Sequence, residues 1–218
     1  MSGNAFRRRS ATQIKRAVCV STMLLMSAIA AHAEGVQQRV AELTTQRCAA
    51  CHGVDGNSTD GPYPRLAGQY PEYLFKQLMQ FKGGPGVKPL RHSDVMHAMV
   101  EDLSPEEMQA LAAYYAAQKP AYGAATHDAL LDAGKAVFTQ GGAGGAPACI
   151  ACHRQNGGGI EPDFPRIGGQ HALYIEAQLR AWKSGARGGK GKLMSLIVPL
   201  LSDDEIAAVA AYVSSLQP

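Results

Sequence analysis

Cys48-Ala-Ala-Cys51-His52 and, 101 residues further on, Cys149-Ile-Ala-Cys152-His153 decide the fold of this 218-residue chain. The sequence around the two pentapeptides repeats with them. The stretch 64–84 matches the stretch 165–185 at nine of 21 positions, and both stretches begin with Pro-Arg and continue to Gly-Gln. The chain is therefore predicted to be two copies of one domain of about 90 residues, and not a short-period solenoid.

Each copy is predicted to be helical. Ser104-Pro105-Glu106-Glu107 and Ser202-Asp203-Asp204-Glu205 have the form of capping boxes, and apolar residues follow each at helical spacing. Middle helices are expected near 71–81 and 172–182, and another helix opens each copy. The expected apolar faces comprise Val36, Val40, Leu43, Met108, Leu111, Tyr115, Leu130, Ala133, Val137, Phe138, Ile206, Val209, Val213 and Leu216. No sustained alternating pattern appears, so the fold class is all-α.

The N-terminus has the pattern of a secretory signal peptide. Residues 1–16 carry five cationic side chains and no acid, and residues 17–31 are uncharged. Ala31-His32-Ala33 has the small residues of a cleavage site, so residues 1–33 are predicted to be removed after Ala33. An uncleaved anchor helix is the alternative, but fifteen residues are short for one. An exported protein is therefore expected.

Removal of the signal peptide reverses the net charge. The formal charge of +3 becomes about −2, with 16 basic and 18 acidic residues, so no electrostatic argument for nucleic-acid binding remains. The domains are predicted at 34–119 and 127–218, with a linker at 120–126. The glycine-rich run 141–145 is expected to be a flexible loop.

Cys-x-x-Cys-His is the attachment signature of c-type haem. The two thiols, three residues apart, can each add to one haem vinyl group, and the histidine that follows can bind the iron. Two haem c groups are therefore predicted, attached through Cys48 and Cys51 and through Cys149 and Cys152, with His52 and His153 as iron ligands. The alternatives are a zinc site, a thioredoxin-like redox pair and a structural disulfide.

The repeat also indicates the second axial ligands. Met194 is the only methionine of the second copy, and it lies seven residues before Leu201; Met96 lies seven residues before the equivalent Leu103. Met96 and Met194 are therefore predicted to fill the remaining axial position of each iron. The rivals His97 and Met99 align with residues that cannot bind iron. His127 and His171 are expected at the surface.

Arg65 and Arg166, which follow proline in the repeated segment, are predicted to pair with haem propionates. Tyr73, Tyr174 and Trp182 are candidates for the same edge of the haem, although residues of these types are as often simply part of a core.

With these features the chain resembles the dihaem cytochrome c4 family. The resemblance covers the sequence from about residue 34 to the end. It implies two tandem class I cytochrome c domains related by pseudo-twofold symmetry, with their haems facing each other. It also implies a periplasmic electron carrier, loosely associated with the membrane, that passes electrons from a quinol-oxidising complex or dehydrogenase toward a terminal oxidase.

Two other functions are kept open. A dihaem enzyme such as a cytochrome c peroxidase would need an open or displaceable iron ligand, which a methionine in each copy argues against. A haem subunit held permanently in a dehydrogenase complex fits the sequence as well as a free carrier does.

Overall fold

The computed structural model describes residues 30–84, 86, 88–122, 129–188 and 192–218. Most of the predicted signal peptide and residues 123–126 of the predicted linker lie outside these ranges. By its contacts the chain divides into two compact units, Met1–Arg39 and Val40–Pro218. Among the described residues there are helices and isolated bridges but no strand. None of the helices in these ranges has the length and apolar character needed to cross a membrane.

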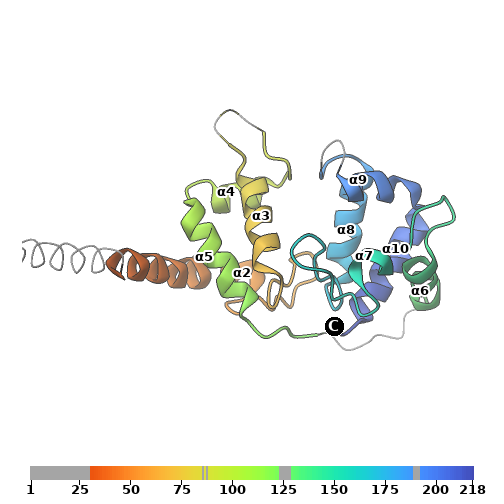
Figure 1. Ribbon diagram of the computed structural model, residues 1–218, viewed down its shortest axis with the longest axis horizontal. Coiled ribbons are helices and arrows are strands. Elements are labelled where there is room, and N and C mark those ends of the chain that lie inside the picture. The colour runs from red at the N-terminus through yellow and green to blue at the C-terminus, as the bar shows by residue number, and fades with distance from the viewer. Residues whose placement is uncertain (1–29, 85, 87, 123–128, 189–191) are drawn as a thin grey trace, which may run out of the picture. The chain divides into compact units, whose positions relative to one another are not determined.

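The first copy opens with helical residues 30–43, which continue into a π-helical turn, η1 (Thr44–Cys48). The short helix α2 (Ala49–His52) follows and contains the first histidine of interest. Three further helices complete this copy: α3 (Pro71–Lys82), α4 (Asp94–Val100) and α5 (Pro105–Ala116). Figure 1 shows α3 and α5 side by side, and they are in contact.

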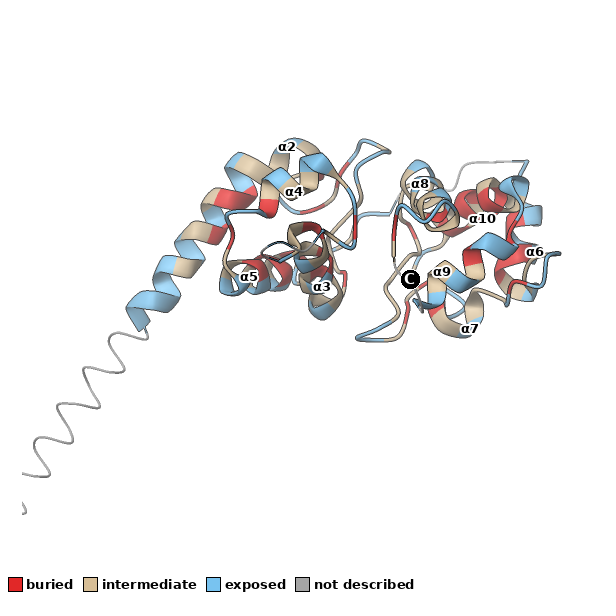
Figure 2. Cartoon of the chain, turned by 90° about the horizontal axis from the view of Figure 1, so that it is seen from above, coloured by how far each residue is buried: buried red, intermediate tan, exposed pale blue. Residues whose placement is uncertain are grey.

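The second copy repeats this order with α6 (Leu131–Gln140), α7 (Ile150–His153), α8 (Ala172–Lys183), α9 (Leu193–Ile197), the 3-10 turn η2 (Val198–Leu200) and α10 (Asp203–Ser215). The middle helices start and end within one residue of the predicted ranges. Helix α10 packs against α6 and α8, and its apolar side chains form the centre of a core with Phe138 and Leu179. Figure 2 shows this concentration of buried residues along α10.

Both predicted capping boxes are present. The Ser104 hydroxyl accepts a hydrogen bond from Glu107 N, and the Glu107 carboxylate accepts one from Ser104 N; Ser202 and Glu205 do the same at the start of α10. The two boxes set where the last helix of each copy begins. Behind the first box Met108, Leu111 and Tyr115 are buried, as predicted.

The predicted inner face of α6 was wrong at two positions. Ala133 and Leu130 are exposed, whereas Gly134 is buried against α10. A Cβ at Gly134 would lie 2.0 Å from the carbonyl oxygen of Ala208. The two helices approach so closely that only glycine fits at this position. The spacing of apolar side chains could not predict this contact, because glycine has no side chain.

The glycine-rich run also differs from expectation, because it forms a tight packed turn. Gly142 N donates to Ala146 O at 3.0 Å, and Ala143 N donates to the Glu205 carboxylate at 2.7 Å. Gly141 has a φ of +99°, a conformation that favours glycine. The turn thus places the buried Ala146 under α10 just before the second pentapeptide begins.

Candidate haem sites

Helices α2 and α7 present the two histidines in the same way. The side chains of His52 and His153 are both buried, and in each the ring Nδ1 lies 3.0 Å from the carbonyl oxygen of the proline twelve residues later, Pro64 or Pro165. A carbonyl oxygen only accepts, so Nδ1 carries the proton and the lone pair of Nε2 is left for a metal. This contact fixes both the tautomer and the orientation of an iron-binding imidazole.

Burial also sets the protonation of these rings. Removal from water lowers the pKa of both His52 and His153, and the proline carbonyls oppose this only in part. The positive charge of Arg91 lowers the pKa of His52 further. Both imidazoles are therefore neutral at neutral pH, which is the form that binds a metal.

The four cysteines of the two pentapeptides are free and half-buried. Burial raises the pKa of the Cys149 thiol to about 11, and it raises that of Cys48 as well. Among the described residues no group of three or more His, Cys, Asp or Glu side chains is placed to hold a metal ion.

The two methionines lie on equivalent helices, Met96 on α4 and Met194 on α9, and both are half-buried. Met194 packs against the core of the second copy. The rival His97 also lies on α4, where its Nδ1 lies 3.0 Å from Phe81 O and its Nε2 lies 3.9 Å from the Glu101 carboxylate. The choice of Met96 over His97 rests on the repeat, in which His97 aligns with Ser195.

Two repeated lysines fix the segments that carry the methionines. The Lys82 ammonium group donates to Leu103 O, and the Lys183 ammonium group donates to Leu201 O at 2.8 Å. Each lysine ends a middle helix, and each carbonyl follows the methionine by seven residues. The end of the middle helix is therefore tied to the far end of the methionine segment in the same way in both copies.

Three buried polar atoms have no hydrogen-bond partner among the described residues: Tyr115 Oη, Arg166 Nε and Ser195 Oγ. Arg166 belongs to the repeated segment that the sequence associates with a haem and Ser195 lies beside a proposed methionine ligand, whereas Tyr115 belongs to the predicted apolar face of α5. Tyr115 lies beside Cys48, which together with burial raises the pKa of this tyrosine, and Ser195 follows Met194. Buried polar groups are rarely left without a partner, so these atoms fit sites made to receive a further polar group.

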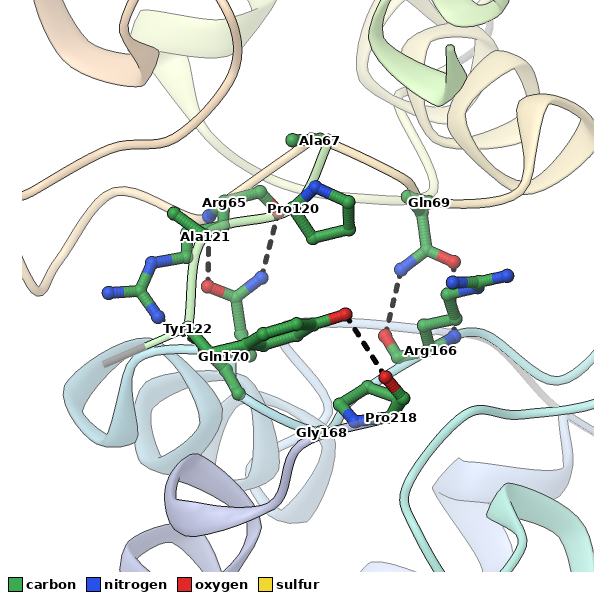
Figure 3. A pocket seen from close by; sticks show the side chains of 11 residues that line it. Arg65, Ala67, Gln69, Pro120, Ala121, Tyr122, Arg166, Gly168, Gln170 and Pro218 are labelled. Atoms are coloured by element: carbon green, nitrogen blue, oxygen red, sulfur yellow. Dashed lines mark hydrogen bonds between the residues drawn. The ribbon is translucent and has the colours of Figure 1, made fainter. Parts of the chain in front are cut away.

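Arg65 and Arg166 lie where the two copies meet (Figure 3). The amide group of Gln170 exchanges two hydrogen bonds with the backbone of Arg65, at 2.9 and 2.9 Å, and the Gln69 amide does the same with the backbone of Arg166, at 3.0 and 2.8 Å. This reciprocal arrangement joins the repeated Pro-Arg-x-x-Gly-Gln segments across the boundary.

The two guanidinium groups differ in their contacts. That of Arg65 donates to Gly169 O and Ser58 O, whereas that of Arg166 lies over the Tyr70 ring at 5.1 Å. The pocket beside them encloses about 30 Å³, which is room for water but not for a macrocycle. Their pairing with propionates stays a prediction, to which the unpartnered Arg166 Nε lends support.

His171 is only partly buried, and it also contacts the other copy. Its Nε2 lies 2.8 Å from Ser58 O of that copy, and burial lowers its pKa, although the Ser58 contact opposes this. Helical periodicity could not predict this contact, because it does not show where the two copies meet. His127 lies outside the described residues.

The sequence analysis missed two arginines, Arg91 and Arg187, which are 7% and 6% exposed. They lie at an antiparallel bridge between the two copies, and the hydroxyls of Tyr73 and Tyr174 contact them. Their offset of 96 differs from the 101 and 98 of the flanking repeats, because they lie in the loop where the copies differ in length. The sequence does contain one signal for this pair: in each copy a single arginine lies between the repeated lysine and the predicted methionine ligand.

The fold and the two histidine sites define a class of protein, the c-type cytochromes with tandem haem domains. Comparisons with known proteins agree. The family model for cytochrome c matches residues 37–118 and again 131–217. Cytochrome c4 of Azotobacter vinelandii is 41% identical over 177 residues, which are 78% of this chain and 84% of that protein.

Two further comparisons extend this. The reduced recombinant cytochrome c4 from Pseudomonas stutzeri superposes with a TM-score of 0.74 at 38% identity, over 84% of this chain and 98% of that one. The thiosulfate dehydrogenase electron acceptor of Thiomonas intermedia is 38% identical over 174 residues, 77% of each chain.

The chain therefore belongs to the cytochrome c family, and within it to the dihaem cytochromes c4. Its two Cys-x-x-Cys-His motifs carry two covalent haem groups, one in each domain. The protein is an electron-transfer protein and not an enzyme.

Proposed function

We propose that this protein is exported, cleaved after Ala33, and carries electrons in the periplasm between a quinol-oxidising complex or dehydrogenase and a terminal oxidase. The proposed domains are 34–119 and 127–218, joined by residues 120–126. The signal-like N-terminus and the balanced charge of the remaining chain support export and a soluble carrier.

The proposed iron ligands are His52 and Met96 in the first domain and His153 and Met194 in the second. The attachment residues are Cys48 and Cys51, and Cys149 and Cys152. The matching contacts to Pro64 O and Pro165 O support the two histidines of this assignment most directly. When bound, the haem supplies a one-electron change between ferric and ferrous iron.

The residues of the chain have three tasks in this function. The proline carbonyls hold each imidazole in one tautomer, and burial keeps it neutral, so no proton need leave the ring when it binds iron. Met96 and Met194 would supply the second protein ligand of each iron and would thereby exclude exogenous ligands. The lysine contacts to Leu103 O and Leu201 O fix the methionine segments, so that neither ligand has to move during electron transfer.

Carbon monoxide binding tests the closed irons. Neither haem of the reduced protein is expected to bind carbon monoxide readily near neutral pH, because a histidine and a methionine would hold each iron. Met194→Ala is expected to open one haem per chain, whereas Met79→Ala, at an exposed methionine of α3, is expected to open none. Rapid stoichiometric binding by the unaltered protein would favour a dihaem enzyme such as a peroxidase.

A second candidate is a haem subunit or acceptor that serves a dehydrogenase. The similarity to proteins described as thiosulfate dehydrogenase electron acceptors supports it. Purification from native membranes distinguishes the two: a free carrier elutes alone, whereas a subunit elutes with a dehydrogenase and its activity.

A further inference from the structure

The Tyr115 hydroxyl is a buried polar group that lacks a partner. Tyr115 belongs to α5 and is 4% exposed, and its Oη makes no hydrogen bond in the described part of the chain. A Cβ at Gly56 would lie 2.7 Å from Tyr115 Cδ1, so the backbone at residue 56 packs directly against the ring and holds it in place. Buried hydroxyls are rarely left unpaired, so a partner for this one is expected.

The Cys48 thiol, the first of the two thiols proposed to attach a haem, neighbours this hydroxyl. Burial raises the pKa of Tyr115 most, and the negative charge of a Cys48 thiolate raises it further. Conversely, the Tyr115 hydroxyl lowers the pKa of Cys48 against the stronger effect of burial. The two groups therefore lie within reach of each other.

A second tyrosine lies beside the other cysteine of the same motif. The Tyr63 ring stands edge-on to His52, with 6.4 Å between the ring centroids and 73° between the ring planes. The charge of Cys51 raises the pKa of the Tyr63 hydroxyl. Tyr63 directly precedes Pro64, whose carbonyl oxygen contacts His52 Nδ1, so the segment that orients the histidine also positions this tyrosine.

The second copy has the ring of Tyr63 without its hydroxyl. Phe164 precedes Pro165 as Tyr63 precedes Pro64. Its ring stands edge-on to His153, with 6.5 Å between the centroids and 86° between the planes. The two rings thus occupy the same place beside their histidines, and only the hydroxyl distinguishes them.

The second copy also lacks a counterpart of the Tyr115 hydroxyl. The carbonyl oxygen of Tyr115 accepts a hydrogen bond from Gly68 N at 3.0 Å, and that of Val213 accepts one from Gly169 N at 3.0 Å. Val213 is therefore the structural equivalent of Tyr115. Because valine has no polar side-chain atom, this position offers no hydroxyl to the second motif.

We propose that Tyr63 and Tyr115 donate hydrogen bonds to the two sulfur atoms that attach the first haem, and thereby favour the reduction of that haem alone. The proposal rests on the proposed function, because it needs a haem held by Cys48 and Cys51. A cysteine sulfur that is bonded to a haem carries no proton and can only accept, so a hydroxyl beside it has to donate.

The effect on reduction follows from the direction of these hydroxyl dipoles. Each donor turns its positive hydrogen end toward the edge of the haem, and reduction adds one negative charge there. Hydrogen bonds to the more negative state are stronger, so both donors favour the ferrous form. Tyr115 is expected to contribute more than Tyr63, which is 37% exposed, because water screens an exposed dipole.

Redox titration of the haem-loaded protein, which gives one reduction equilibrium constant for each haem, tests this asymmetry. Tyr115→Phe removes only the hydroxyl and is expected to lower one constant about threefold to tenfold, which is about 28–59 mV for one electron. The other constant is expected to stay unchanged. Tyr63→Phe is expected to lower the same constant about twofold.

The reverse substitution is made in the second copy. Phe164→Tyr adds a hydroxyl to the equivalent ring and is expected to raise the other constant about twofold. Tyr114→Phe is the matched control, because the Tyr114 hydroxyl already donates to Val54 O at 3.1 Å in an exposed contact. It is expected to change neither constant by more than about 1.5-fold.

The outcomes separate the proposal from the function on which it rests. Unchanged constants in Tyr115→Phe, or equal shifts of both, would overturn the proposal. If Tyr115→Phe loads haem poorly, Tyr63→Phe and Phe164→Tyr decide instead, and the proposal fails unless they shift different constants in opposite directions. Two haems per chain and closed irons in the unaltered protein would confine such a failure to the proposal, whereas an unaltered protein without haem would contradict the proposed function itself.

Discussion

Gly134 has no room for a side chain, and this single residue sets how closely α6 and α10 approach. The carbonyl oxygen of Ala208 and the Cβ atom of Tyr212 occupy the space that a methyl group at residue 134 would need, at 2.0 and 2.7 Å. A helix position of this kind accepts only glycine, even though glycine weakens an isolated helix.

Gly134→Ala is therefore expected to lower the free energy of unfolding by about 1–3 kcal/mol, because α6 must move away from α10. Denaturant unfolding followed by the fluorescence of Trp182, the only tryptophan and a residue of the second domain, measures this loss. Ala133→Ser, on the exposed side of the same helix, is the control and is expected to change stability by less than about 0.5 kcal/mol. An unchanged midpoint for Gly134→Ala would contradict the close packing.

At the scale of elements, the two domains use the same helix start. The Ser202 hydroxyl accepts a hydrogen bond from Glu205 N at 3.1 Å, and Ser202 N donates to the Glu205 carboxylate at 2.8 Å. Two of the backbone donors that a helix leaves free at its start are thereby satisfied. The Glu205 carboxylate also accepts from Ala143 N, so this cap fixes the glycine-rich turn as well.

Ser202→Ala is expected to destabilise the second domain by about 1 kcal/mol and to speed amide exchange at Glu205. Ser214→Ala is the matched control, because the Ser214 hydroxyl donates only to Ala211 O within α10. Hydrogen exchange read residue by residue distinguishes the two variants. Equal protection of Glu205 in both would show that the box does not determine where α10 begins.

At the scale of the whole molecule, the two domains are joined by side chains that the repeat duplicates. Gln69 and Gln170 each bind the backbone of the arginine in the opposite copy through two hydrogen bonds (Figure 3). The glutamines that the repeat duplicates therefore form a contact between the two domains. The same residues account for the repeat in the sequence and for the pairing of the domains.

The double variant Gln69→Ala/Gln170→Ala is expected to lose about 0.5–1.5 kcal/mol for each of the four bonds and to let the domains separate. Small-angle scattering of the haem-loaded protein would then show a larger radius of gyration. Gln118→Ala is the control, because Gln118 donates to Tyr114 O within its own copy. A scattering profile unchanged by the double variant would mean that other contacts hold the domains together.

The sequence predicts the helices well because their signals are local. Capping boxes and apolar spacing lie within one segment, and the structure agrees with them for α5 and α10. The roles of Gly134, His171 and the Arg91–Arg187 pair arise from segments far apart in the chain, so no local pattern reveals them. The repeated motif predicted the cytochrome class. The buried arginines could not be recognised as an equivalent pair, because the two loops that contain them differ in length.

The most direct test of two irons bound by histidine and methionine is optical spectroscopy of the purified oxidised protein, with haem counted per chain. The account predicts two haems and a methionine–iron charge-transfer band that Met194→Ala halves and Met96→Ala/Met194→Ala abolishes. A colourless protein, one haem per chain, or a band that survives the double substitution would contradict it.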